Sequence, residues 1–446
     1  MECDAIIVGG GLSGLATGWH RQLRDEHVCV LDRSDTPGGV VQTIKQDGYR
    51  VEAGPNTLMV NDRRVMDLID GVGLADRMVE ATPDASKRFL VKNGEVIAAP
   101  MSPKDLWNTP LFSTQAKRQL LTEVFRGKYL GRDEESLADF VRRRLGAEWL
   151  DQAVQPMVSG VYAGDPERLS VRYAMPALYQ MEQDAGSLLL GGIRKMLKPS
   201  PHRMKRKLVS FRDGMDELPQ AMAEKLGDAY VSGVEITQLS QTNSGWKACW
   251  RSDHGGGEEQ ELEAKELVLS VPAFALTTLP LAPELREKLQ RLAEIPYAPV
   301  NVVALGFDRS QVGHALDGFG MLIPDREGQP ILGSLFSSTL FPGRAPEGKV
   351  LLTCFIGGRL HPERAAVVDR DLVDATVSSL RDLLGVNGDP EFQHIVRWER
   401  AIPQMEIGHG QYLEQIAELE KQWLGLQIGG NFRYGISAPQ CLLAGI

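Results

Sequence analysis

Apolar residues cluster in short runs near the start of the chain. Residues 5–8 form an apolar run, residues 12–23 carry apolar positions three and four apart, and residues 27–31 form a second, largely apolar run. Short apolar runs are typical of strands buried in a parallel sheet, and the middle spacing is typical of an amphipathic helix. The order strand, helix, strand predicts the first unit of a Rossmann-like α/β domain.

The pattern changes from strand to helix and back along the rest of the chain. Helical spacing dominates residues 102–183, where helices are predicted to begin at Pro103, Thr114, Ser136, Ala147 and Ser170. Strands are predicted at residues 40–44, 49–52, 208–211, 231–236, 266–271, 300–307, 319–323, 331–336, 350–356, 393–398 and 426–429. Helices are predicted at 214–226 and 371–384, and another from about residue 435.

These patterns divide the chain into three predicted domains. A discontinuous Rossmann-like dinucleotide-binding domain comprises residues 1–75, 208–272 and 400–446. A mixed-sheet substrate-binding domain comprises residues 76–101 and 273–399, and an inserted helical domain comprises residues 102–207. The predicted fold class is therefore α/β with an added α-helical domain.

Composition narrows the classes of partner. The chain has 446 residues, which is longer than a typical single domain, so two or three domains are expected. Its net charge of −10 argues against nucleic acid as a partner. The five cysteines form no CxxC pair and no Cys/His group at metal-ligand spacing, so buried thiols and no metal are expected. The sequence shows neither a signal-peptide pattern nor a membrane-spanning run, so we expect a cytoplasmic protein, at most peripheral on the cytoplasmic membrane face.

Gly9, Gly11 and Gly14 stand between the first strand and the first helix at the spacing of a dinucleotide fingerprint. The first allows a tight turn, the second lets the backbone approach a pyrophosphate, and the third lets the helix pack on the strand. The helix N-terminus directs its N–H groups at the phosphates. Asp32, at the end of the second strand, supplies a carboxylate for ribose hydroxyls. Together these residues predict an adenine dinucleotide site.

Gly38 and Gly39 follow Asp32 within one short loop. Many flavoproteins place such a glycine pair beside the pyrophosphate, while the acid at the end of the second strand binds the ribose. The pair therefore favours a flavin, FAD, over a nicotinamide cofactor.

Further motifs follow in a definite order. They are GYRVEAGPN at 48–56, RFL at 88–90, SGVYAGDP at 159–166, FRDGM at 211–215, LFP at 340–342 and GGNF at 429–432. Their order and spacing resemble the flavin-dependent porphyrinogen oxidases of haem and chlorophyll synthesis, a branch of the amine-oxidase-like flavoproteins. The resemblance covers nearly the whole chain, and the run at 159–166 is its most specific part.

The resemblance implies oxidation of a porphyrinogen to a porphyrin, with six electrons removed in three flavin cycles, O2 as the acceptor and H2O2 as the product. Protoporphyrinogen IX is placed ahead of coproporphyrinogen III as the substrate. An amine oxidase or a carotenoid desaturase on the same scaffold, and a non-catalytic binding protein, remain as alternatives.

The resemblance also implies four substrate-binding residues. Arg88 matches the family's propionate-binding arginine, Leu322 and Phe341 match apolar positions that enclose pyrrole rings, and Gly160 lies where the backbone approaches the substrate closely. No catalytic acid or base is implied, because hydride passes from the macrocycle to FAD. An apolar chamber wide enough for a flat tetrapyrrole precursor is expected over the flavin.

The cofactor-binding positions follow from the glycine turns and from the resemblance. They are Gly9, Gly10, Gly11, Leu12, Ser13, Gly14, Asp32, Arg33, Gly38, Gly39, Val40, Gly54, Pro55, Asn56, Thr57, Val234, Trp398, Gly435, Ile436, Ser437 and Ala438. The resemblance places the loop at 54–57 beside the cofactor and the Val234 backbone near adenine. Trp398 and residues 435–438 are expected on the flavin-ring and ribityl side.

Three features depart from the resembled family. Asp32 replaces the usual glutamate, Thr36 stands where an arginine is common, and the family's closing helix is expected to continue beyond Ile446. The shorter acid and the missing cation remove contacts that would hold the dinucleotide.

Residues 194–207 are basic on an otherwise acidic chain. They include Arg194, Lys195, Lys198, Arg203, Lys205, Arg206 and Lys207 and no acidic residue. The stretch is either a solvated loop or a surface that meets anionic lipid or steers a carboxylate-bearing substrate. By the resemblance, the helical domain docks on a membrane surface. A homodimer is a further expectation.

Overall fold

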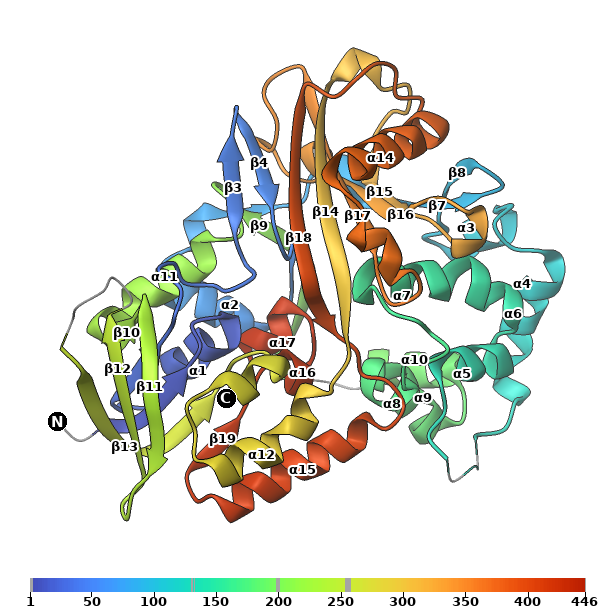
Figure 1. Cartoon of the computed structure of the whole chain (residues 1–446). Helices are drawn as coiled ribbons and strands as arrows, with labels where there is room; N and C mark the ends of the chain where they lie inside the picture. Colours follow the sequence, from blue (N-terminus) through green and yellow to red (C-terminus); the bar gives the residue numbers. More distant parts are fainter. Residues whose placement is uncertain (1–2, 130, 132, 198–200, 253–257, 446) are drawn as a thin grey trace.

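The computed structural model describes residues 3–129, 131, 133–197, 201–252 and 258–445, and Figure 1 shows their arrangement. One seven-stranded sheet has the order β10-β2-β1-β13-β12-β11, with β19 joined to β13. Its strands are β1 (Cys3–Val8), β2 (Val28–Leu31), β10 (Tyr230–Val231), β11 (Val234–Gln241), β12 (Trp246–Ser252), β13 (Gln260–Leu269) and β19 (Leu426–Ile428). β1 runs parallel to β2 and β13, which confirms the predicted Rossmann-like unit.

Helices cover both faces of this sheet. One face carries α1 (Leu12–Gln22), α2 (Arg63–Gly71), α11 (Glu217–Leu226) and α17 (Ala438–Leu442), and the other carries α12 (Pro283–Ala293) and α15 (His409–Gln422). In β1, Ala5 and Ile7 pack on the first face, and Ile6 and Val8 on the second. A strand covered on both faces has to be apolar throughout, which explains the run at 5–8.

A second seven-stranded sheet has the order β18-β14-β17-β16-β15-β7-β8. Its strands are β7 (Lys87–Lys92), β8 (Glu95–Ala98), β14 (Tyr297–Asp308), β15 (Gly318–Leu322), β16 (Ile331–Phe336), β17 (Lys349–Gly357) and β18 (Phe392–Pro403). β15 runs parallel to β7, and the other neighbours are antiparallel, so the sheet is mixed as predicted. Helix α14 (Asp369–Leu384) packs its apolar side on this sheet.

The helices predicted over residues 102–183 are confirmed, and one more helix, α10, follows them. This helical segment contains α3 (Pro103–Asn108), α4 (Thr114–Leu121), α5 (Leu137–Arg144), α6 (Ala147–Trp149), α7 (Gln155–Tyr162), α8 (Val171–Ala174), α9 (Pro176–Ala185) and α10 (Leu188–Leu197). Figure 1 shows these helices, in cyan to green, gathered on one side of the molecule. The division into three domains at the residues given above stays a prediction.

Smaller strands connect these parts. β3 (Thr43–Gln46) and β4 (Tyr49–Glu52) form a hairpin, and β9 (Arg203–Phe211) lies between β5 (Leu58–Asp62) and β6 (Met78–Glu80). Two short helices, α13 (Ser337–Leu340) and α16 (Asn431–Tyr434), precede turns that carry predicted site residues.

Three predicted elements are wrong at their bounds. The strand at 40–44 begins only at Thr43, because the Val41 N–H donates back to the carbonyl oxygen of Gly38 and continues the glycine turn. The strand at 231–236 is two strands, divided where Gly233 adopts a φ of +60°. The stretch at 194–207 is not one loop: Arg194 and Lys195 belong to α10, and β9 begins at Arg203. Lys198 lies outside the described residues.

The cysteines are buried and unpaired, as predicted: Cys3, Cys29, Cys249, Cys354 and Cys441. Within the described ranges, no helix is long and apolar enough to cross a membrane.

Candidate flavin and substrate site

The first glycine turn has the geometry that its spacing predicts. Gly9 has a φ of +111°, and its N–H donates to the carbonyl oxygen of Leu31 at 2.8 Å. A Cβ atom on Gly14 would collide with the carbonyl oxygen of Gly9, so α1 can approach the turn only because residue 14 is glycine. A Cβ atom on Gly11 would meet no atom within 4 Å. Gly11 therefore faces open space at the N-terminus of α1, where a pyrophosphate can approach the backbone.

The second glycine pair lies against the first turn. The Gly38 N–H donates to the carbonyl oxygen of Gly10 at 2.8 Å, and Gly38 and Gly39 have φ values of +110° and +61°. A Cβ atom on Gly39 would lie 3.5 Å from the Gly11 Cα. The structure thus joins two glycine turns that are separated in sequence. Leu12 and Ser13, the first residues of α1, are buried beside them.

Asp32 directly follows β2, beside these turns, and is 8% exposed. Its Oδ2 accepts the Gly10 N–H at 2.7 Å, and its Oδ1 accepts the Ser34 N–H at 3.0 Å. Burial raises the pKa of this carboxyl. Each oxygen retains a second lone pair for a ribose hydroxyl. Arg33 and Thr36 have exposed side chains, so neither is fixed against the turn by burial.

Val234 lies beside the same acid. Its N–H donates to the carbonyl oxygen of Asp32 at 3.1 Å, and its side chain is buried in the sheet core. The buried hydroxyl of Tyr230 has no hydrogen-bond partner among the described residues, and the ring lies against the Gly10 turn. Within the described part of the chain, the Tyr230 hydroxyl is therefore a free polar group beside Asp32 and the first glycine turn.

The loop from Gly54 to Thr57 packs on the second glycine turn. A Cβ atom on Gly54 would collide with the carbonyl oxygen of Val40, and the Asn56 side chain donates to the carbonyl oxygen of Gly54 at 3.0 Å. The Trp398 indole N–H donates to the carbonyl oxygen of Ala53 at 2.7 Å. Three segments are therefore brought together here: Val40, the loop at 54–57 with Pro55 and Thr57, and Trp398.

The C-terminal turn reaches α1. Gly435 has a φ of +119°, and the Ser437 hydroxyl donates to Oε1 of Gln440 at 2.6 Å in a capping box that starts α17. Ala438 of α17 packs with the apolar side of α1. Ile436 instead packs its side chain in the core of the helical segment. Of this predicted group, Ala438 lies beside α1, whereas the Ile436 side chain lies beside the helices.

The predicted substrate residues surround β15. The Arg88 Cζ lies 5.2 Å from the ring centroid of Phe319, and an Arg88 N–H donates to the carbonyl oxygen of Ser86 at 3.2 Å. A Cβ atom on Gly160 would collide with Cδ2 of Leu322. Phe341 is buried in an apolar cluster to which Phe319 also belongs. The four predicted residues thus form two contacts beside the neighbouring strands β7 and β15: Gly160 meets Leu322, and Arg88 meets the cluster that contains Phe341.

Asn56 of the flavin loop and Phe341 line one cavity. The cavity measures about 10 Å³, too little for a tetrapyrrole, so the expected wide chamber is not open here. The Leu322 side chain occupies the space over Gly160. A side chain at residue 160 would therefore collide with Leu322, so glycine allows this close contact between α7 and β15.

A buried ion pair that the sequence did not reveal lines the same cavity. The Arg344 Nη1 lies 3.0 Å from Oε1 of Glu52, and the two side chains are 3% and 4% exposed. The Arg344 Cζ lies 5.6 Å from the Phe341 ring centroid. Burial raises the pKa of Glu52 to about 6, although Arg344 opposes the shift. Glu52 stands within the quoted 48–56 motif, but no signal marked Arg344.

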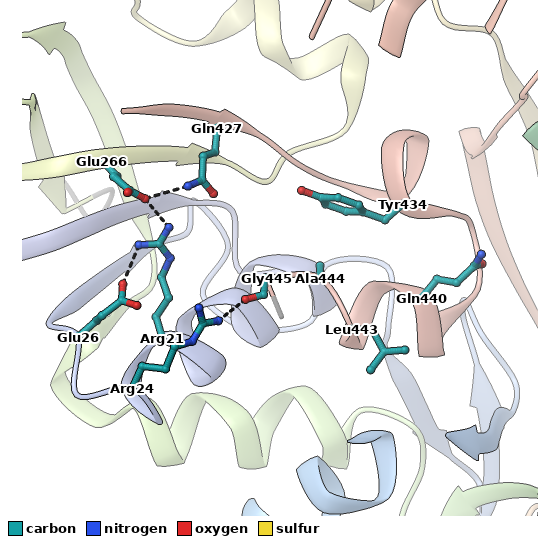
Figure 2. Close-up of a pocket in the computed structure, with 10 residues that line it drawn as sticks. All are labelled: Arg21, Arg24, Glu26, Glu266, Gln427, Tyr434, Gln440, Leu443, Ala444 and Gly445. Carbon is teal, nitrogen blue, oxygen red and sulfur yellow. Dashed lines mark hydrogen bonds and ion pairs between the residues drawn. The ribbon is translucent and has the colours of Figure 1, made fainter. Parts of the chain in front are cut away.

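A larger cavity, of about 660 Å³, lies elsewhere, and Figure 2 shows its lining. Arg21 pairs with Glu26 at 2.9 Å, and the Gln427 side chain donates to Glu266 at 2.8 Å. None of its lining residues is a predicted site residue: Arg21, Arg24, Glu26, Glu266, Gln427, Tyr434, Gln440, Leu443, Ala444 and Gly445. This cavity is therefore distinct from the candidate site.

Comparison with known proteins agrees with this geometry. The family of flavin containing amine oxidoreductases matches residues 12–446. The chain belongs to this family and is a flavin-dependent oxidoreductase, and its open Gly11 cradle and Asp32 carboxylate fit a flavin dinucleotide.

Named relatives refine the picture. The chain is 30% identical to the mitochondrial protoporphyrinogen oxidase of Nicotiana tabacum, over 98% of this chain and 92% of that protein. It is 27% identical to the coproporphyrinogen III oxidase of Bacillus subtilis (strain 168), over 98% and 95%. A crystal structure of a candidate protoporphyrinogen oxidase from Exiguobacterium sp. 255-15 has the same fold, with a TM-score of 0.79, 22% identity and coverage of 100% and 97%.

Proposed function

We propose that this chain oxidises a porphyrinogen to a porphyrin with FAD, and that protoporphyrinogen IX is its substrate in haem biosynthesis. The observation that carries the proposal is the similarity, over 98% of the chain, to two enzymes named for porphyrinogen oxidation. The contact of the flavin loop with the substrate cluster, through the cavity that Asn56 and Phe341 share, supports it.

Bound FAD supplies a two-electron acceptor, and three rounds take six electrons and six protons from the macrocycle to O2, giving three H2O2. The protein residues bind and orient the substrate. Arg88 binds a carboxylate of the substrate. Leu322, Phe319 and Phe341 contact the macrocycle with apolar side chains and exclude water. Transfer of a hydride from a macrocycle carbon needs no general base. The mainly apolar residues around the proposed substrate position agree with such a reaction.

The charge at the site favours the substrate with fewer carboxylates. Arg50 pairs with Asp213 at 3.3 Å, and Arg344 pairs with Glu52 at 3.0 Å. Among the described residues, Arg88 takes part in no ion pair. Protoporphyrinogen IX carries two carboxylates and coproporphyrinogen III carries four, so a site with few uncompensated cations supports the former. Coproporphyrinogen III is the alternative substrate.

Anaerobic reduction tests the proposal. Each porphyrinogen is mixed with the FAD-loaded protein without O2, and bleaching of the flavin absorbance is followed. We expect both to bleach the flavin, and protoporphyrinogen IX to do so faster. The reverse order would assign coproporphyrinogen III. No bleaching by either substrate, with bleaching by an amine or a carotenoid, would replace the proposal by one of those activities. A protein that retains no flavin would indicate a binding protein.

Replacing Arg88 by alanine is expected to raise KM by about 10- to 100-fold, the value of one charge-assisted hydrogen bond. The kcat should change much less, because an anchor remote from the reacting carbon binds ground state and transition state alike. Steady-state kinetics with the reduced porphyrinogen measures both. Replacement of the neighbouring Lys87, which pairs with Asp317, is the control. A loss of kcat at constant KM would contradict the anchoring role.

We also propose that this protein is cytoplasmic and binds the membrane surface peripherally, with α10 in contact with anionic lipid. Its exposed apolar residues recur three and four apart, along one side of the helix. They are Leu190 (48% exposed), Ile193 (56%), Met196 (73%) and Leu197 (79%). Arg194 and Lys195 lie among them, so apolar and cationic groups meet on one exposed helix.

Flotation with liposomes tests this contact. Neutralising Arg194 and Lys195 to glutamine is expected to weaken binding to acidic liposomes, since each cation near such a surface contributes about 1 kcal/mol. Neutral liposomes provide the control, because both proteins should bind them equally. Equal binding of the two proteins to acidic liposomes would reject the charged part of the surface.

A further inference from the structure

Arg206 stands on β9 two residues before Leu208, so the two side chains leave the same face of the strand. Leu208, two residues further along β9, packs in the apolar cluster that contains Phe341 and Phe319. The Leu208 carbonyl oxygen accepts the Ala81 N–H at 2.8 Å, which fixes this part of β9 beside the cluster. The Arg88 guanidinium lies over Phe319. Strands β9 and β7, more than a hundred residues apart in sequence, therefore reach the same aromatic ring region.

The two guanidinium groups interact electrostatically. Burial, and then the charge of Arg206, lower the pKa of Arg88. Both side chains are exposed at the edge of the cluster, where a ligand can reach them. Like charges held near each other are unfavourable, and a carboxylate placed between them removes that cost.

Two neighbouring lysines already have carboxylate partners. Lys207 pairs with Glu80, and Lys87 pairs with Asp317. In the part of the chain that the structure describes, no carboxylate pairs with either Arg88 or Arg206. Both arginines are thus cations without a carboxylate partner among the described residues.

We propose that Arg88 and Arg206 together bind the two neighbouring carboxylates of the substrate at the edge of the Phe319–Phe341 cluster. This inference rests on the proposed function and deepens it, because it assigns the second carboxylate contact. A pair of guanidinium groups binds planar carboxylates through directed N–H donors, which single lysines do not reproduce. Arg206 is therefore a substrate-binding residue that favours a porphyrinogen with two adjacent propionates.

Three variants test the pair: Arg206→Gln, Arg88→Gln and Lys205→Gln, the last as a matched exposed cation on the same strand. Arg206→Gln is expected to raise KM about tenfold with kcat nearly unchanged, and Lys205→Gln to have no such effect. With a porphyrinogen whose propionates are esterified, the wild type and Arg206→Gln should behave alike. Quenching of protein fluorescence by the porphyrin product gives an affinity that does not depend on turnover and should fall in parallel.

The outcomes separate this inference from the proposed function. If wild-type protein oxidises no porphyrinogen, the proposed function fails. If wild-type protein is active and Arg206→Gln matches Lys205→Gln in KM and product affinity, the inference is overturned while the function stands. An equal loss with the esterified substrate would also overturn it. Unchanged flavin content and melting temperature exclude a folding defect, and a variant that loses only acidic-liposome binding would assign Arg206 to the lipid surface instead.

Discussion

Replacing Arg144 by methionine is expected to destabilise the protein by about 3–5 kcal/mol, because the change leaves buried carboxylates without their partner. Arg144 and Glu123 are fully buried, and Glu182 is 1% exposed. The Arg144 NH1 lies 2.9 Å from Glu123, and its Nε donates to Glu182 at 2.6 Å. Urea unfolding of the FAD-loaded protein measures the loss.

Two further variants show whether burial is the cause. Arg142, on the same helix, pairs with Glu167 in an exposed position, so Arg142→Met should cost less than about 1 kcal/mol. Adding Glu123→Gln and Glu182→Gln to Arg144→Met should recover part of the stability, because these changes remove the uncompensated charges. If Arg144→Met were as mild as Arg142→Met, the buried network would be structurally unimportant.

The same network fixes the proposed lipid surface. Glu123 accepts the Leu188 N–H at 2.9 Å and the Ser187 hydroxyl at 2.6 Å, so it caps the N-terminus of α10. A carboxylate at a helix N-terminus accepts hydrogen bonds from the free N–H groups and interacts favourably with the positive end of the helix dipole. Arg144 is the ion-pair partner of this buried acid, at 2.9 Å. The position of α10, and with it the exposed apolar side of this helix, therefore depends on the buried Glu123–Arg144 pair.

Local chemistry explains which parts of the fold could be predicted. Three predicted helix starts carry serine caps whose side chains accept N–H groups of the first turn: Ser102 from Asp105, Ser113 from Ala116 and Ser136 from Asp139. Such caps depend on neighbours in sequence. The break at Gly233 was missed because apolar residues continue on both sides of it, and only the φ of +60° reveals the turn.

The candidate site also contains residues that the sequence could predict and contacts that it could not. Gly9, Gly11 and Gly14 follow rules of spacing, so the turn could be predicted before its geometry was known. Glu52 and Arg344 meet from segments almost three hundred residues apart, and no local pattern specifies such a contact. The contact between Gly160 and Leu322 is of the same kind, because it joins segments far apart in the sequence. Long-range contacts between single side chains are therefore the part that sequence patterns leave open.

Alanine substitutions at Gly14 and Gly11 should separate folding from flavin binding. Gly14→Ala places a Cβ atom against the Gly9 carbonyl oxygen, a rigid backbone contact, and is expected to cost about 1–3 kcal/mol and to abolish bound flavin. Gly11→Ala meets no protein atom and keeps an ordinary φ of −73°, so the melting temperature of the flavin-free protein should not change. Its methyl group nevertheless points to the open pyrophosphate position, so flavin affinity should fall at least about tenfold. Fluorescence titration with FAD and thermal unfolding measure the two effects. Normal flavin binding by Gly11→Ala would mean that the pyrophosphate does not approach the backbone there.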